Sequence, residues 1–192
     1  FFNFINDFKK NDLIGDPVTC NFPEIGSIDP TTLRYIKVAS DLMFLFGDNI
    51  NKIAEVGAGY GGQCLIIDKV FHINEYHLFD LPIVLELISK YLEAHLLNSS
   101  YKTFTLNQHA GDCEYDLVVS NLAFSELPVQ TQIKYIKKVL SKSKRGYITM
   151  NTGSKHFPSG TNPHLPVEEI LKYLPQCEII NDTTQPSIER HY

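Results

Sequence analysis

The spacing of apolar residues switches between helical and strand periodicity along most of the chain. The first clear helix follows Asp29 and Pro30, which suit the N-cap and the first helical position. We expect helices over residues 30–46, 63–71, 82–97, 128–140 and 167–174, and strands over residues 52–56, 76–79, 102–106, 116–120, 146–150 and 177–180. Alternating strands and helices predict an α/β fold whose doubly wound, mostly parallel sheet has helices on both faces.

The beginning of the chain lacks this regularity. It carries a cluster of apolar side chains: Phe1, Phe2, Phe4, Ile5 and Phe8. Such a cluster predicts a short helix packed on the domain, or else a contact in an oligomer. Glycines and prolines punctuate the stretch that follows. We therefore divide the chain into an irregular lead-in, residues 1–29, and a single domain, residues 30–192.

The composition excludes several classes of protein. The chain has 192 residues, 43% of them hydrophobic and 20% charged, which is typical of one globular domain. A formal net charge of −5 argues against nucleic-acid binding. The longest apolar run, residues 42–46, is far too short to span a membrane. The four cysteines are scattered without zinc-site spacing, which predicts reduced, mostly packed thiols and a cytoplasmic location.

The loop after the first predicted domain strand carries the strongest chemical signal. It reads Gly57-Ala58-Gly59-Tyr60-Gly61-Gly62 and fits the pattern G-x-G-x-x-G. Glycines let the chain turn tightly and let a ligand approach the free N–H groups that begin the next helix.

Two acidic residues flank this signal. Glu55 would repel a pyrophosphate but attract a cation, such as the ammonium group of S-adenosylmethionine. Asp80, at the end of the second strand, is placed to accept hydrogen bonds from both hydroxyls of an adenosine ribose. Since NAD and S-adenosylmethionine share that ribose, Asp80 does not distinguish between them.

Several segments resemble a known family. They read Pro-Thr-Thr-Leu-Arg-Tyr (30–35), Glu-Val-Gly-Ala-Gly-Tyr-Gly-Gly (55–62), Phe-Asp-Leu-Pro (79–82), Tyr-Asp-Leu-Val-Val-Ser-Asn-Leu-Ala-Phe-Ser-Glu-Leu (115–127) and Lys-Arg-Gly-Tyr-Ile-Thr-Met-Asn (144–151). On them the chain resembles the class I S-adenosylmethionine-dependent methyltransferases. The run Ser-Asn-Leu-Ala-Phe-Ser-Glu-Leu resembles, more narrowly, the sugar O-methyltransferases of bacterial surface-polysaccharide clusters. The resemblance implies a Rossmann-like fold and methyl transfer from S-adenosylmethionine to a hydroxyl of a sugar or glycan-like small molecule.

The same resemblance implies roles in cofactor binding. The methionine part of the cofactor would be held by Glu55, Gly57, Ala58, Gly59 and Tyr60. Asp80 would hold the ribose, and Leu81 would pack beside the adenine. Gln108, in the segment Asn107-Gln108-His109, would offer an amide to the adenine amino group. Asn121, just past the fourth strand, would line the methyl-transfer cavity.

Transfer to a sugar hydroxyl also needs a base that takes the hydroxyl proton late in the reaction. Glu126, on the loop after the fourth strand, is our first candidate. His156 and His164, in the polar loop after the fifth strand, follow, and His109 is a further candidate. For acceptor binding we single out Ser125 and Arg34; the arginine would otherwise pair with the cofactor carboxylate. No pair of acids has metal-ligand spacing, so we assign no metal ligands; acids distant in sequence that assemble in space around magnesium stay an open alternative.

Two other functions stay open at this point. An NAD-dependent oxidoreductase could use the same loop, although Glu55 disfavours it and no hydride-transfer residues are recognisable. A non-catalytic binding module with this fold would keep the cofactor site without turnover.

The end of the chain departs from the family's pattern. The family's sheet ends with an antiparallel seventh strand between the fifth and sixth, and only residues 181–192 remain to form it. We expect a six-stranded sheet whose last edge strand is missing, as in a truncated chain. An uncovered edge would permit a homo-oligomer.

Overall fold

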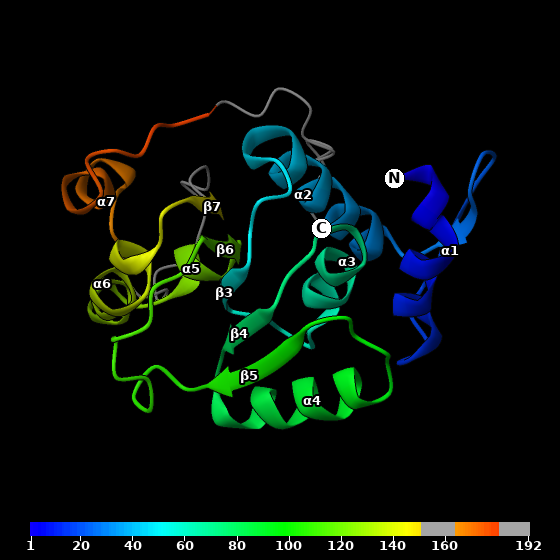
Figure 1. Ribbon diagram of the computed structural model, residues 1–192, viewed down its shortest axis with the longest axis horizontal. Coiled ribbons are helices and arrows are strands. Elements are labelled where there is room, and N and C mark those ends of the chain that lie inside the picture. Colours follow the sequence, from blue (N-terminus) through cyan, green and yellow to red (C-terminus); the bar gives the residue numbers. More distant parts are fainter. Residues whose placement is uncertain (151–163, 181–192) are drawn as a thin grey trace, which may run out of the picture.

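The computed structural model describes residues 1–150 and 164–180, and its centre is one parallel sheet (Figure 1). The strands are β3 (Lys52–Val56), β4 (Glu75–Phe79), β5 (Ser100–Phe104), β6 (Leu117–Asn121) and β7 (Gly146–Thr149). Their order is β5-β4-β3-β6-β7, and every neighbouring pair is parallel. The chain thus fills one half of the sheet, returns to the centre and fills the other half. The order reverses between β3 and β6, where ligands bind in sheets of this kind.

Helices cover both faces of the sheet, as predicted (Figure 1). They are α2 (Pro30–Phe46), α3 (Gly62–Val70), α4 (Pro82–Glu93), α5 (Ala123–Glu126), α6 (Val129–Lys138) and α7 (Val167–Tyr173). Helices α2, α3 and α4 enclose one apolar core, and α5, α6 and α7 enclose the other. Neighbouring strand residues serve opposite cores, so that Ile53 packs in the first and Ala54 in the second. The predicted α/β architecture is confirmed.

The expected start of α2 is confirmed in detail. Asp29 Oδ1 accepts a hydrogen bond from Thr31 N at 2.8 Å, and Pro30 occupies the first turn. Gly47, with a φ of 68°, ends the helix.

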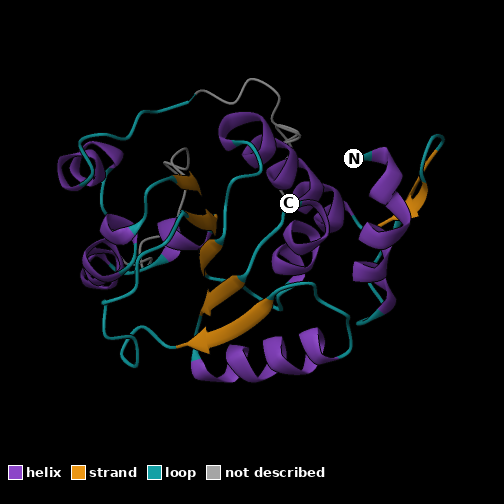
Figure 2. Cartoon of the chain, viewed as in Figure 1, coloured by secondary structure: helices purple, strands orange, loops and turns teal. Residues whose placement is uncertain are grey.

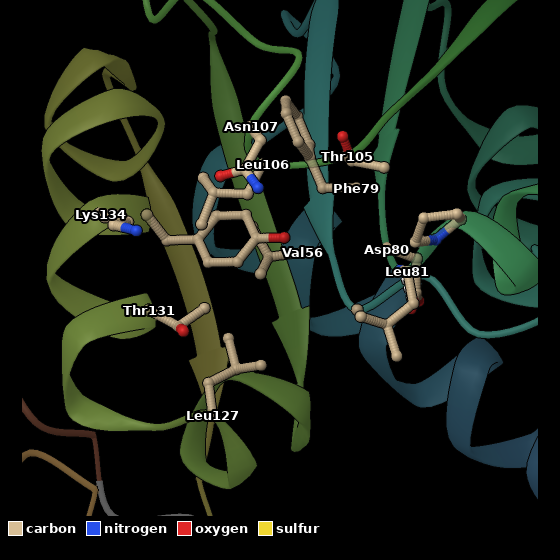
Figure 3. A pocket seen from close by; sticks show the side chains of 13 residues that line it. Val56, Phe79, Asp80, Leu81, Thr105, Leu106, Asn107, Leu127, Thr131 and Lys134 are labelled. Atoms are coloured by element: carbon tan, nitrogen blue, oxygen red, sulfur yellow. Dashed lines mark hydrogen bonds between the residues drawn. The ribbon is translucent and has the colours of Figure 1, made fainter.

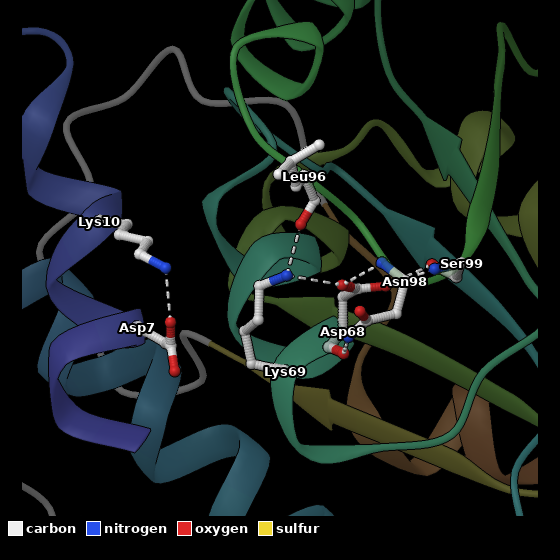
Figure 4. A network of polar contacts seen from close by, with 7 residues as sticks. All are labelled: Asp7, Lys10, Asp68, Lys69, Leu96, Asn98 and Ser99. Carbon is white, nitrogen blue, oxygen red and sulfur yellow. Dashed lines mark hydrogen bonds and ion pairs between the residues drawn. The ribbon is translucent and has the colours of Figure 1, made fainter. Parts of the chain in front are cut away.

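The connection from α4 to β5 differs from the expected boundaries. The helix ends at Glu93 rather than at residue 97, and β5 begins at Ser100 rather than at residue 102. Asp68, buried in α3, accepts hydrogen bonds from Asn98 N and Ser99 N, each at 2.8 Å (Figure 4). Because these amides bind the carboxylate, the chain leaves the helix before them and enters the strand directly after them.

The sixth strand predicted over residues 177–180 is wrong, and the described sheet has five strands instead of six. Ile179 and Ile180 are 62% and 61% exposed. In the pattern that the resemblance implies, a sixth strand pairs with the inserted seventh strand rather than with β7. A strand forms only beside a neighbour, and none of the described strands pairs with residues 177–180. Residues 181–192, which would supply the seventh strand, lie outside the described residues.

The lead-in contains regular structure where we expected an irregular stretch (Figure 2). Its elements are the 3₁₀ helices η1 (Phe2–Phe4) and η2 (Lys9–Leu13), helix α1 (Ile5–Phe8), and an antiparallel pair, β1 (Cys20–Phe22) and β2 (Gly26–Ile28). The short helix predicted from the aromatic cluster is confirmed, and Phe8 is its fully buried anchor in the core beside α2 and α3.

Predictions about the cysteines and about membrane spans were also made from the sequence. All four cysteines are free, as predicted, but only Cys64 is buried, and Cys20 and Cys177 are exposed. The expected packing is therefore wrong for two of the four, because Cys20 lies on the β1–β2 hairpin and Cys177 lies beyond α7. Within the described ranges, no helix has the length and apolar character needed to cross a membrane.

Candidate active site

A cavity of about 350 Å³ opens at the carboxyl ends of the central strands (Figure 3). It is lined by Val56, Gly57, Phe79, Asp80, Leu81, Pro82, Thr105, Leu106, Asn107, Leu127, Thr131, Lys134 and Tyr135. Asp80 and Leu81 lie on one side of it, and Thr131 and Lys134 of α6 lie on the other (Figure 3). The cavity therefore spans the point where the strand order reverses.

The glycine loop forms the floor of this cavity at Gly57. The Gly57 N–H donates to the Phe79 carbonyl at 2.8 Å, which ties the loop to the end of β4. Gly57 has a φ of 75°, and a Cβ there would lie 2.1 Å from the Ala123 Cβ. Only glycine fits this position, because the loop turns directly against the start of α5.

Asp80 connects the second strand end to the same loop. Its Oδ2 accepts from the Gly59 N–H at 3.0 Å, and its Oδ1 accepts from the Leu81 N–H at 2.8 Å. Beside Gly59, which has a φ of 58°, no other atom lies within 4 Å of where a Cβ would stand. The carboxylate and an open stretch of loop backbone are thus brought together.

Glu55 is buried beneath the cavity and does not line it. It points to the face of the sheet that carries Ile53, is 2% exposed, and accepts a hydrogen bond from the Tyr76 hydroxyl at 2.8 Å. Burial raises the pKa of Glu55 to about 8, and the charge of Asp80 adds to this effect, whereas the Tyr76 bond opposes it. The predicted attraction to a cation would therefore act from beneath the loop.

The raised pKa of Glu55 predicts a loss of stability with rising pH. Between pH 4.5 and about 8 the folded carboxyl holds a proton that the unfolded chain has released. The free energy of unfolding should therefore fall by up to about 1.4 kcal/mol per pH unit in this window. Glu55→Gln keeps an acceptor for Tyr76 but cannot ionise. In urea unfolding the stability of this variant should gain on wild type as the pH rises, whereas parallel pH profiles would contradict the prediction.

The other cofactor-binding candidates take different positions. Ala58 is buried, and the Tyr60 ring packs into the core, 5.0 Å from the Tyr91 ring centroid. Gln108 accepts hydrogen bonds from Thr105 N and Oγ1 at 3.0 and 2.8 Å, which closes the turn after β5. Its neighbour Asn107 lines the cavity instead.

Asn121 joins the end of β6 to the glycine-loop helix. Its Nδ2 donates to Gln63 Oε1 at 3.0 Å, and its Oδ1 accepts from the Thr149 hydroxyl at 2.8 Å. The next residue, Leu122, has a φ of 67°, a conformation rare for leucine. Ser125 is buried and donates to the Leu122 carbonyl at 2.6 Å. These contacts hold the loop after β6 in a strained turn beside the cavity.

The candidate bases Glu126 and His164 lie on two segments that the Gln132 side chain connects. Glu126 is the exposed last residue of α5 and precedes Leu127, which lines the cavity. His164 is half-buried and precedes Leu165, whose N–H donates to Gln132 Oε1 at 2.7 Å. The buried Gln132 side chain also donates to the Phe124 carbonyl at 2.7 Å, which ties both segments to α6.

Three further candidates lie away from the cavity or outside the structure's description. Arg34 is exposed on α2, with its guanidinium carbon 5.7 Å from the Tyr35 ring centroid. His109 is buried, and its ring lies 5.0 Å from that of Phe79, behind the cavity wall. His156 lies outside the described residues. Among those that are described, no group of acids, histidines and cysteines could hold a metal ion.

Sequence reasoning missed the wall that α6 supplies. Thr131, Lys134 and Tyr135 line the cavity, whereas the sequence predicted only a helix over residues 128–140 and no part for it in the site. The available signal was the position of this helix, which follows β6 closely and therefore begins at the carboxyl edge of the sheet.

Comparisons with known proteins show which fold this chain shares. No protein-family model matches the sequence, and no curated protein matches it. Among solved structures, the magnesium protoporphyrin IX methyltransferase ChlM from Synechocystis PCC 6803, with bound SAH, matches with a TM-score of 0.57 and 15% identity. That match covers 78% of this chain and 77% of ChlM. The chain has the class I methyltransferase fold.

Two further structures share the class I methyltransferase fold with this chain. TehB from Haemophilus influenzae matches with a TM-score of 0.54 and 17% identity over 72% of this chain. The mitomycin 7-O-methyltransferase MmcR matches with a TM-score of 0.56 and 13% identity over 74% of this chain. The chain spans about half of each, 49% of TehB and 46% of MmcR. Identities this low establish a shared fold and no shared acceptor, so the sugar specificity is unsupported by these matches.

Proposed function

We propose that this protein is an S-adenosylmethionine-dependent methyltransferase. The observation that carries the proposal is the contact of Asp80 with the Gly59 N–H beside a cavity at the strand-order reversal. It places a carboxylate suited to two ribose hydroxyls next to open loop backbone that a ligand can approach.

The cavity offers the remaining groups that the cofactor needs. Leu81, Leu106 and Leu127 supply apolar surface for the adenine ring, and the Asn107 side chain supplies an amide beside them. The methionine part would extend along the glycine loop toward Asn121. Its ammonium group would lie above Glu55, and a cation there would favour release of the proton that burial keeps on this carboxyl.

The chain's own task in the reaction is alignment and proton transfer. The cofactor supplies an electrophilic methyl group, which passes from sulfur to the acceptor oxygen. The cavity walls hold the two reactants in line and keep water out. Glu126, next to the cavity-lining Leu127, would accept the proton that the acceptor hydroxyl loses. His164 would be the alternative base.

The acceptor is, in our proposal, a hydroxyl of a sugar or glycan-like small molecule, and the enzyme works in the cytoplasm. The support is the resemblance of residues 120–127, the segment that forms the end of β6, the strained turn and α5. The names of ChlM and MmcR point to a magnesium porphyrin and to mitomycin, so the fold alone does not select an acceptor.

Cofactor binding is the first test. Calorimetry should show micromolar binding of S-adenosylhomocysteine (SAH), and Asp80→Ala should weaken it by about 1–3 kcal/mol, the value of a charge-assisted hydrogen bond. Replacing the exposed Asp48 with Ala is the matched control and should leave the affinity unchanged. Binding of NADH in place of SAH would favour the oxidoreductase, and a chain that binds neither would refute the proposal.

The acceptor requires a second experiment. Methyl-donor consumption should be followed across nucleotide sugars, free sugars and lipid-linked glycans, and one of these classes should increase it. SAH binding without turnover on any acceptor would favour the non-catalytic binding module.

A further inference from the structure

The lead-in places one polar side chain directly under the glycine loop. Asn11, in η2, is 3% exposed. Its Nδ2 donates to the hydroxyl of Tyr60 at 2.9 Å and to the hydroxyl of Thr32 at 2.5 Å. Its Oδ1 accepts from the Tyr91 hydroxyl at 2.5 Å. A residue far from the loop in sequence thus hydrogen-bonds a loop residue, α2 and α4.

These contacts require an amide side chain. Asn11 uses two donors and one acceptor at once, a combination that aspartate and aliphatic residues lack. The fit is also tight, because a Cβ on Gly62 would lie 2.7 Å from Asn11 Oδ1 and 2.6 Å from the Tyr60 ring. Asn11 therefore meets the loop both at Tyr60 and at the start of α3.

The loop is a segment that needs such support. Gly57, Gly59 and Gly61 all have positive φ values, and glycine is the residue with the most backbone freedom to lose on ordering. Tyr60 lies between the last two of these glycines, and its ring packs against Tyr91. Fixing Tyr60 fixes the loop on both sides of it.

A neighbouring residue, Asp12, also attaches the lead-in to the domain, and it shares the Thr32 hydroxyl with Asn11. Asp12 Oδ1 accepts from the Thr32 hydroxyl at 2.6 Å, and Asp12 Oδ2 accepts from the Asp29 N–H at 2.9 Å. The Asp12 side chain thus hydrogen-bonds α2 and its N-cap rather than the Tyr60 hydroxyl, and it anchors η2 to α2. Asp12 therefore anchors the helix, and Asn11 contacts the glycine loop.

We propose that Asn11 is a positioning residue for the cofactor: it holds the Tyr60 hydroxyl and thereby keeps the Gly57–Gly61 backbone in the conformation that binds the cofactor. The inference rests on the proposed function. A loop already held in its binding conformation loses less entropy when the ligand arrives, so affinity increases without a direct contact.

The test compares Asn11→Leu with Asp12→Ala. SAH affinity is measured by calorimetry well below the melting temperature of each variant. Asn11→Leu should weaken SAH binding about 3–10-fold, the value of one or two hydrogen bonds. Asp12→Ala, which loosens the same helix but leaves the Asn11–Tyr60 hydrogen bond in place, should change the affinity less than about 2-fold even where it lowers the melting temperature as much. Equal losses of affinity in the two variants would overturn the proposal, as would unchanged affinity in Asn11→Leu.

Tyr60→Phe extends the test if Asn11→Leu fails to fold. It keeps the ring and removes the hydroxyl that hydrogen-bonds both Asn11 and Tyr35, so it should weaken SAH binding at least as much as Asn11→Leu. In the Tyr60→Phe background, Asn11→Leu should have little further effect; additive losses would overturn the proposal.

Hydrogen exchange of the loop amides, measured without any ligand, separates the two proposals. Exchange in residues 57–62 should be faster in Asn11→Leu than in Asp12→Ala. Faster exchange in a protein that never binds SAH would refute the cofactor and leave the loop contact standing. Unchanged exchange in a protein whose wild type binds SAH would refute the positioning role alone.

Discussion

Replacing Glu126 with Gln is expected to lower the methyl-transfer rate about 10²–10⁴-fold and to leave SAH affinity nearly unchanged. The amide keeps the shape of the side chain and removes its ability to accept a proton. Position supports this expectation, since Glu126 ends α5, and Leu127, the next residue, lines the cavity. The rate is measured with the acceptor that the methyl-donor screen identifies.

Two variants make the result interpretable. Glu24→Gln changes an exposed acid on the β1–β2 hairpin and should leave the rate unaltered. If Glu126→Gln retains its rate while His164→Ala or His156→Ala loses it, the base belongs to the segment after β7. If Glu126→Gln loses SAH affinity together with its rate, Glu126 has a structural role instead.

Gly57→Ala should be the most damaging single-methyl change in the loop. The new Cβ would lie 2.1 Å from the Ala123 Cβ, at a backbone φ of 75°. Backbone strain and overpacking together should lower the free energy of unfolding by about 2–5 kcal/mol. SAH binding should fall with it, because relief of the contact moves the floor of the cavity. Urea unfolding and calorimetry measure the two effects.

Matched variants divide this loss into its two causes. Gly47→Ala has a similar φ of 68° with nothing within 4 Å of the new Cβ, so it should show backbone strain without overpacking, about 1–3 kcal/mol. Adding Ala123→Gly to Gly57→Ala removes the atom that the new methyl group meets and should restore part of the stability. A double variant no more stable than Gly57→Ala would show that the contact is not the cause.

The architecture could be predicted where local signals and tertiary structure agree. The start of α2 follows from Asp29 and Pro30, because a cap and a fixed φ act within one turn. Residues 177–180 form a short, mostly apolar segment that suits a strand, but a strand also needs a neighbour, and a short sequence segment carries no information about one. Helix α5 was missed because its four residues, Ala123–Glu126, are too few to show a period.

The residues of the candidate site likewise fall into two groups: those that local sequence features predicted and those whose role depends on tertiary contacts. Gly57 and Asp80 were found because a glycine turn and an acid at a strand end are local features, and the structure places both on the cavity. The depth of Glu55 was not predictable, since it depends on the helices that cover that face of the sheet. The contribution of Asn11 was equally hidden, because 49 positions separate it from Tyr60.

The adjacency of β3 and β6 has a consequence for how the molecule reaches its native state. The Ser120 hydroxyl donates to the Val56 carbonyl at 2.8 Å across 64 positions of sequence. Contacts of this range form late, because the intervening chain must close first. A partly folded chain with only β3, β4 and β5 paired would hold Asp80 and the glycine loop but lack the wall made by α6. Because such an intermediate offers only half of the cavity, a ligand that needs both walls would selectively stabilise chains that have completed the sheet.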